Sequence, residues 1–219
     1  ADNVPQTTEA VSKADAIGPL IAMLGPSRGN DSQKSAAGAL ATLAKVELPP
    51  LPLKSKVRRK KEEEALLEDD SDSSEGEPAP VLPRFAPIAE LGGIPILVDL
   101  LKAERTGPHE NATEAIWRLA GIGDNKLAIA DVGGIPALVN LLSTGSVATQ
   151  RFAAAAMSNL ARDCPQNQLK LAKAKAILPL VQLLGAESAE TQDFAVSALL
   201  SLASHPESRN AVVKRLVAV

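Results

Sequence analysis

Apolar residues in this chain recur in blocks, and residues 133–161 show the pattern most completely. Four of them share one face of a predicted helix: Ile135, Leu138, Leu141 and Leu142. Pro136 stands in the first turn of that helix, where a proline loses no hydrogen bond. A shorter helix is expected at about residues 125–131, before the helix that contains Pro136. A polar link at residues 143–146 is expected to end the helix that contains Pro136. An alanine-rich stretch from about 148 to 161 predicts a third helix.

The same block occurs before and after this one with a nearly constant period. Leu97, Leu138 and Leu180 occupy matching positions that are 41 and 42 residues apart. A more diverged copy begins near Ala16, and its Leu20 precedes Leu97 by 77 residues, one period plus a 35-residue insertion. Three helices of this size cannot bury their apolar faces alone, whereas stacked copies can. The repetition therefore predicts an all-α solenoid that is stabilised mostly by contacts between its units.

The composition changes between residues 47 and 83. Prolines lie at both ends of this stretch, and six basic and nine acidic residues between Lys54 and Glu77 account for the whole net charge of −3. Such a segment has too little apolar surface to offset the entropy of ordering, so we expect a disordered insertion. The remaining 17 basic and 17 acidic residues balance. Without a basic excess in the repeats, specific binding of nucleic acid is not expected.

Two stretches of the central block resemble a known repeat. Residues 133–142 read GGIPALVNLL and residues 150–161 read QRFAAAAMSNLA. They resemble the armadillo repeat, whose usual pattern is close to GxIPxLVxLL followed by AAxALxNLA. The resemblance implies an all-α alpha-alpha superhelix of about four repeats, with the third helices lining a concave groove. It is nearer to armadillo adaptors of the vacuolar membrane than to the nuclear-import receptors.

The resemblance also implies an order of units along the chain. They are a diverged first repeat at 9–46, the insertion at 47–83, a second repeat at 84–121, a third at 122–162, a fourth at 163–204, and the first helix of a truncated fifth repeat at 205–219.

In peptide-binding armadillo proteins, the asparagine of the closing Asn-Leu-Ala lines the groove and can bond a peptide backbone. The matching positions here are Thr42, Arg118, Asn159 and Ser201. One turn earlier the matching positions are Gly38, Glu114, Ala155 and Ser197. Nuclear-import receptors carry tryptophans in this second row, so their absence argues against recognition of basic import signals. The resemblance thus implies a groove for another protein or peptide, and the alternative is an ordinary solvated face.

Trp117 is the only tryptophan of the chain and lies one position before Arg118. It matches Ala41, Ser158 and Leu200 in the other repeats. An exposed tryptophan often anchors an interface, but packing on the edge of the neighbouring unit is favoured. The predicted partner-binding residues are Thr42, Glu114, Trp117, Arg118, Asn159, Ser197 and Ser201.

The insertion carries three candidate linear motifs. A basic run fits a nuclear-import signal, although a plain solvated linker is favoured: Arg58, Arg59, Lys60 and Lys61. Ser74 precedes Glu75 and Glu77 and fits an acid-directed phosphorylation site. The prolines at 49–52 could dock on a proline-reading domain.

No catalytic or metal-binding pattern is present in the sequence. His109 and His205 lack ligand neighbours, and Cys164 has no nearby histidine to activate it. We therefore expect no cofactor, no metal and no enzymatic activity. The single cysteine favours a reducing, intracellular compartment, the cytoplasm foremost, with the nucleus and organelles left open. No apolar run is long enough for a transmembrane segment.

Two functions fit these features. The first is a non-catalytic adaptor that binds another protein or an extended peptide along the concave groove. The alternative is a structural or accessory subunit that is permanently embedded in a larger complex. A chain that purifies alone as a monomer would favour the adaptor.

Overall fold

The computed structural model describes residues 16–45, 86–103 and 107–217. All the regular structure in these ranges is helical. After a helix at residues 16–23 come α2 (Asn30–Lys45), α4 (Ala86–Glu90), α5 (Gly93–Lys102), α6 (His109–Leu119), α7 (Gly123–Asp131), α8 (Gly134–Thr144), α9 (Val147–Ala161), α10 (Pro165–Lys173), α11 (Ile177–Gln182) with a 3-10 turn (Leu183–Gly185), α12 (Ala189–Ser204) and α13 (Pro206–Val217).

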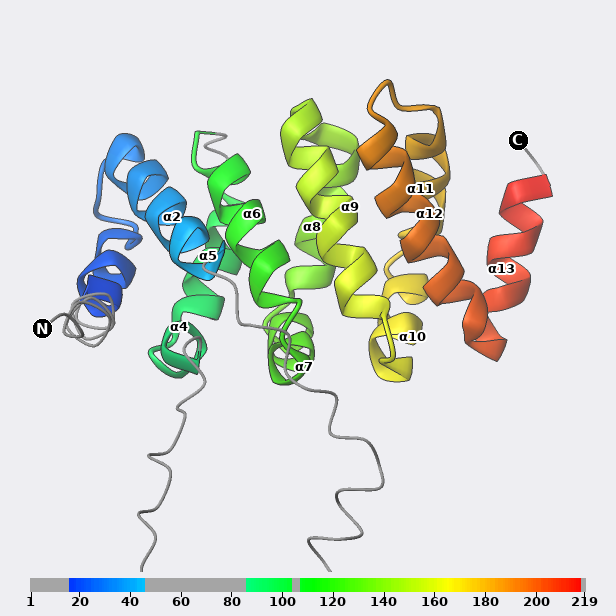
Figure 1. Ribbon diagram of the computed structural model, residues 1–219, viewed down its shortest axis with the longest axis horizontal. Coiled ribbons are helices and arrows are strands. Elements are labelled where there is room, and N and C mark those ends of the chain that lie inside the picture. Colours follow the sequence, from blue (N-terminus) through cyan, green and yellow to red (C-terminus); the bar gives the residue numbers. More distant parts are fainter. Residues whose placement is uncertain (1–15, 46–85, 104–106, 218–219) are drawn as a thin grey trace, which may run out of the picture.

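The helices are stacked in chain order as repeated units (Figure 1). The third helices of the units form one layer, in which α6 packs between α2 and α9, and α9 packs between α6 and α12. The second helices α5, α8 and α11 pack in the same order, as do the first helices α7, α10 and α13. The expected solenoid is therefore confirmed. The expected insertion at 47–83 lies outside the described residues.

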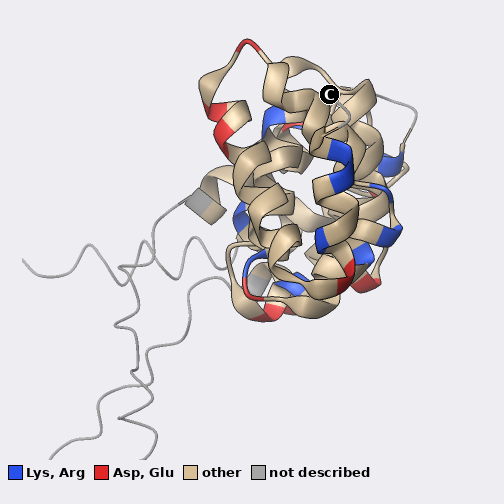
Figure 2. Cartoon of the chain, turned by 90° about the vertical axis from the view of Figure 1, so that its right-hand side faces the viewer, with Lys and Arg blue, Asp and Glu red and all other residues tan. Residues whose placement is uncertain are grey.

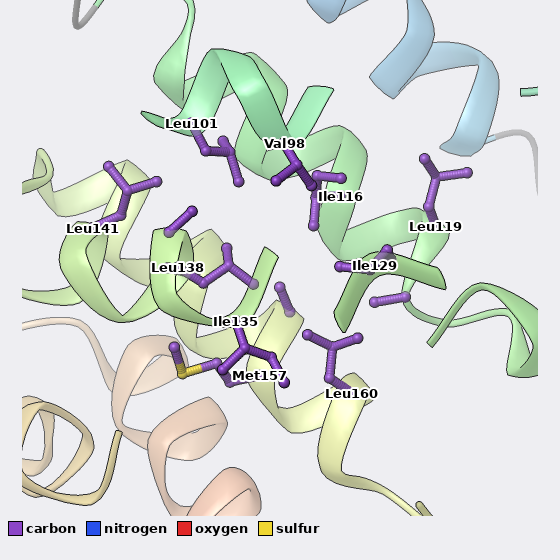
Figure 3. Packing of buried hydrophobic residues seen from close by; sticks show 14 of the residues in the cluster. Val98, Leu101, Ile116, Leu119, Ile129, Ile135, Leu138, Leu141, Met157 and Leu160 are labelled. Carbon is purple, nitrogen blue, oxygen red and sulfur yellow. The ribbon is translucent and has the colours of Figure 1, made fainter. Parts of the chain in front are cut away.

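The core follows the leucine positions that define the period. Leu97, Leu138 and Leu180 are fully buried, each at the same register of a second helix. Figure 3 shows how side chains of α5, α6, α7, α8 and α9 converge around the second of these leucines. Met157 and Leu160 of α9 complete this part of the core. One continuous apolar layer thus joins successive repeats.

A left-handed residue precedes each of the three second helices α5, α8 and α11. Gly92 has φ 75° and Gly133 has φ 84°, and Lys175 adopts φ 63° in the same place before α11. A Cβ at Gly134 would lie 2.6 Å from the carbonyl oxygen of Ile129, which explains the second glycine of the pair. Repeat four accepts Ala176 there, with a shorter α-helix that ends in a 3-10 turn.

Replacing Lys175 by glycine is expected to raise the free energy of unfolding by about 0.5–1 kcal/mol. The left-handed region costs a residue with a Cβ about 1–2 kcal/mol, and the extra freedom of glycine in the unfolded chain offsets part of the gain. Urea denaturation measures the change. Lys173→Gly is the control, because Lys173 is the exposed last residue of α10 and glycine weakens a helix. Equal destabilisation by both variants would contradict the prediction.

A hydrogen bond from a side chain to a backbone carbonyl group recurs near the start of the third helices. The side chains of Gln33, Gln150 and Gln192 donate to carbonyl groups where the preceding helix ends, at Leu24 and Gly25, at Leu142 and at Ala186. His109 occupies the same register, and its Nε2 lies 2.9 Å from the carbonyl oxygen of Ala103. His109 is therefore a buried structural side chain that replaces a glutamine.

A second hydrogen bond of this kind joins each third helix to the first helix that follows it. Asn125, Asn167 and Ser208 share one register, and each donates to the carbonyl group of the leucine in the Leu-Ala pair near the end of the preceding third helix. These leucines are themselves in register: Leu119, Leu160 and Leu202. Carbonyl groups near a helix C-terminus have no partner within the helix, so these bonds satisfy groups that burial would otherwise leave unpaired.

The polar link at residues 143–146 ends α8 later than expected. The helix continues to Thr144, whose hydroxyl donates to the carbonyl group of Asn140 at 3.0 Å. Ser146 then caps α9 by accepting from the amide of Thr149 at 3.2 Å. The expectation was wrong by two residues because the hydroxyl of Thr144 bonds a backbone carbonyl group within the last turn of α8.

Candidate partner-binding face

Four predicted contact residues lie at one register on four neighbouring helices. Thr42 lies on α2, Arg118 on α6, Asn159 on α9 and Ser201 on α12. Thr42 is exposed and the other three are partly exposed. Because these helices are adjacent in one layer, the four side chains form a row across the repeats, which we call the Asn159 row.

The hydrogen bonds within the Asn159 row leave some polar atoms available. The hydroxyls of Thr42 and Ser201 donate within their own helices, to Gly38 at 2.9 Å and Ser197 at 3.0 Å. The amide Nδ2 of Asn159 donates to the carbonyl oxygen of Trp117 at 3.2 Å, which links two repeats. Asn159 Oδ1 accepts no hydrogen bond from the described residues, so it remains open to a ligand donor.

The second predicted row, one turn earlier, is more heterogeneous. Glu114 accepts from Nε and Nη2 of Arg118 at 3.2 and 2.7 Å. The Ser197 hydroxyl lies 2.8 Å from that of Ser158 and thereby links α9 to α12. Ala155 in the same row is fully buried. The structure thus places the predicted residues on one layer of helices but gives several of them internal partners.

Trp117 packs on the units that follow its own, as favoured from the sequence. Its ring stacks on Phe152 of α9 with centroids 5.6 Å apart and meets Phe194 of α12 edge-on at 5.9 Å. Helix α9 lies between α6 and α12, so the rings meet over α9. Trp117 nevertheless remains partly exposed, so an anchoring role is compatible with its position.

Two arginines lie over these rings. The guanidinium carbon of Arg118 is 4.6 Å from the centroid of Trp117, and that of Arg151 is 4.7 Å from the centroid of Phe152. Arg151 also pairs with Glu190 of α12 at 3.1 Å. The sequence prediction missed four residues here: Arg151, Phe152, Glu190 and Phe194. Phe152 and Phe194 share one register of the repeat, and this could have indicated them.

The other predicted sites are not tested by this structure. The basic run Arg58–Lys61, Ser74 and the prolines at 49–52 lie outside the described residues. Within the described ranges, no three His, Cys, Asp or Glu side chains form a group that could hold a metal ion. Two surface hollows lie beside the second helices, one between Leu24 and Leu100 and one between Lys102 and Thr144, away from the Asn159 row.

The described surface carries charges of both signs. Figure 2 views the array from its α13 end and shows basic and acidic residues on the side it presents. In the described part of the chain, no single helix is long and apolar enough to span a membrane. Helices α7 and α8 reach that length and composition only as a pair, and the pair is bent by 82°.

Comparisons with known proteins agree with this geometry. The family model for the armadillo/beta-catenin-like repeat matches residues 124–162, which is the most regular unit. No curated protein matches the chain in sequence. The comparisons do not bear on the resemblance to vacuolar-membrane adaptors.

Solved structures of designed proteins are similar over most of the chain. An engineered protein is 26% identical with a TM-score of 0.69, covering 91% of this chain and 68% of its own. A computationally designed armadillo repeat protein for modular peptide recognition is 24% identical with a TM-score of 0.71, covering 94% and 73%. A designed armadillo repeat protein in complex with the peptide (KR)4 is 22% identical with a TM-score of 0.66, covering 91% and 70%. The chain therefore has the fold of an armadillo-repeat solenoid.

Proposed function

We propose that this protein is a non-catalytic scaffold that binds an extended peptide, or an extended segment of another protein, across its third helices. The observation that carries the proposal is the Asn159 row, which sets polar side chains at one register on four adjacent helices. An extended peptide presents backbone donors and acceptors at regular intervals. A row of fixed side chains on rigid helices suits such a ligand, and solenoids commonly bind along such extended surfaces.

The residues of the row would act by hydrogen bonding and packing. Asn159 Oδ1 is placed to accept from a peptide N–H group, while its Nδ2 is held by the carbonyl group of Trp117. The hydroxyls of Thr42 and Ser201 can accept a hydrogen bond while they donate to their own helices. The partly exposed ring of Trp117 offers an apolar wall to a ligand side chain. A designed armadillo repeat protein of similar fold was solved in complex with the peptide (KR)4, which supports a peptide as the type of ligand.

Selection from a peptide display library tests the proposal. The unmodified protein should enrich peptides that bind with micromolar affinity, and the triple variant Arg118→Ala, Asn159→Ala and Ser201→Ala should weaken them at least about tenfold. The matched control replaces Asp99, Asn140 and Gln182 by alanine. These three exposed residues share one register on the second helices α5, α8 and α11. Unchanged affinity in the first variant, or an equal loss in the control, would contradict binding at the Asn159 row.

The alternative, a subunit embedded in a larger complex, would use a different surface. Val196 and Leu200 on α12 are 43% and 67% exposed, whereas the matching residues of α9, Ala154 and Ser158, are 0% and 1% exposed beneath α12. Three apolar residues of α13 are also exposed: Val213, Leu216 and Val217. Apolar surface of this kind often marks an interface. Light scattering during gel filtration separates the two functions, because a stable monomer favours the peptide-binding scaffold.

A further inference from the structure

The aromatic rings of Trp117 on α6 and Phe152 on α9 already carry cations from this chain. From this arrangement we propose that the face selects peptides rich in carboxylates and rejects basic peptides. The inference rests on the proposed function and assigns the chemistry of its partner. We call the residues concerned the arginine–aromatic cluster: Glu114, Trp117, Arg118, Arg151, Phe152, Glu190 and Phe194.

The positions over the ring faces are occupied within the chain. A cation binds favourably within about 6 Å of an aromatic centroid. Arg118 and Arg151 lie at 4.6 and 4.7 Å from the centroids of Trp117 and Phe152. A lysine or arginine of a ligand would have to displace these guanidinium groups or approach them against like-charge repulsion. The cluster is therefore unsuited to a basic peptide.

The cations of the cluster are held more firmly than its anions. The side chain of Arg118 is 17% exposed while that of its partner Glu114 is 26% exposed, and the corresponding values for Arg151 and Glu190 are 35% and 56%. Each arginine has a ring to pack against, and each glutamate faces solvent to a greater extent. The more exposed of the two pairs, Arg151 with Glu190, is of the kind that contributes little to stability because solvent screens it. A ligand carboxylate can therefore replace a glutamate without displacing an arginine from its ring.

The arginines also have donors to spare. A guanidinium group has five N–H donors. Arg118 donates from two nitrogens to Glu114, and Arg151 donates from one to Glu190. The Nε of Arg151 is buried, so the donors that this side chain offers to a ligand are those of its Nη groups. Asn159 lies beside Trp117 and can hold the backbone of the same peptide. The cluster thus offers paired donors for carboxylates along a bound chain.

Fluorescence tests this directly because Trp117 is the only tryptophan. The protein is titrated with an alternating Glu-Ser peptide, an alternating Gln-Ser peptide of equal length, and (KR)4. The Glu-Ser peptide should give a saturable change in emission with a Kd at least about tenfold lower than that of the neutral peptide, and this preference should decrease with added salt. The peptide (KR)4 should give no saturable change.

Variants that are expected to change the affinity in opposite directions distinguish a loss of peptide contacts from damage to the fold. Arg118→Gln and Arg151→Gln should each weaken binding of the acidic peptide about tenfold, whereas Glu190→Gln should strengthen it about threefold by removing a competing carboxylate. Lys214→Gln is the charge-matched control, because Lys214 is exposed on α13. Tighter binding of neutral or basic peptides, or no gain with Glu190→Gln, would overturn the inference and leave the proposed function intact. No binding of any peptide, including those selected from the library, would overturn both.

Discussion

Leu138→Ala lowers the free energy of unfolding by about 2–5 kcal/mol, the largest effect expected of a single substitution described for this chain. Leu138 is fully buried in α8, which packs against α5, α9 and α11. Alanine removes apolar contacts and leaves a cavity that rigid neighbouring helices cannot fill. Urea denaturation followed by circular dichroism measures the loss, provided that the denaturant dependence shows a single transition.

Leu127→Ala is the matched control for this substitution. Leu127 lies on α7 in the same repeat and is 39% exposed. Its replacement should cost less than about 1 kcal/mol because water already contacts part of the side chain. Similar losses at Leu127 and Leu138 would show that the second helices do not form the core that the repeat pattern indicates.

Asn167→Ala is expected to cost about 1–3 kcal/mol although it removes only a small polar side chain. Asn167 is fully buried, and its Nδ2 donates to the carbonyl oxygens of Lys126 and Leu160 at 3.0 and 3.2 Å. Alanine would remove both bonds and leave the carbonyl group of Leu160, near the end of α9, without this donor. Asn167 Oδ1 is buried and has no hydrogen-bond partner among the described residues. Removing this unpaired atom is favourable, so it offsets part of the lost stability.

Two further variants test whether the loss in Asn167→Ala comes from the hydrogen bond to Leu160. Asn210→Ala removes an exposed asparagine from α13 and should change stability by less than about 0.5 kcal/mol. Asn167→Ser should recover part of the loss, because Ser208 makes the equivalent bond to Leu202 in the next unit. If alanine and serine at position 167 were equally harmful, the loss would not arise from the hydrogen bond to Leu160.

The architecture was predictable from the sequence because the repeats share one pattern of apolar positions. Matching leucines set the period, and a helix pattern that recurs at that period can bury its apolar faces only by stacking. The stacking of α6, α9 and α12 was therefore predictable. The left-handed conformation of Lys175 was not, because the sequence shows only that glycine is missing there. The capping role of His109 likewise required the position of the Ala103 carbonyl group.

For the candidate site, the sequence predicted which positions of the repeats match one another, but not the contacts between their side chains. Thr42, Arg118, Asn159 and Ser201 were expected in one row, and the structure places them on adjacent helices. The contact between Trp117 and Phe194 was missed because it joins residues two repeats apart. An alignment of neighbouring units does not reveal such a contact.

Each helix packs mainly on helices of its own and adjacent units, and this determines where the array opens most easily. Each end of the described array has one fewer neighbour to hold it than the middle has, so opening there disrupts fewer interfaces. Backbone amide protons of α9, which is enclosed between α6 and α12, are therefore expected to exchange with solvent last. Those of α13 and of the helix at residues 16–23 are expected to exchange first, so protection should decline gradually from α9 toward both ends of the described array.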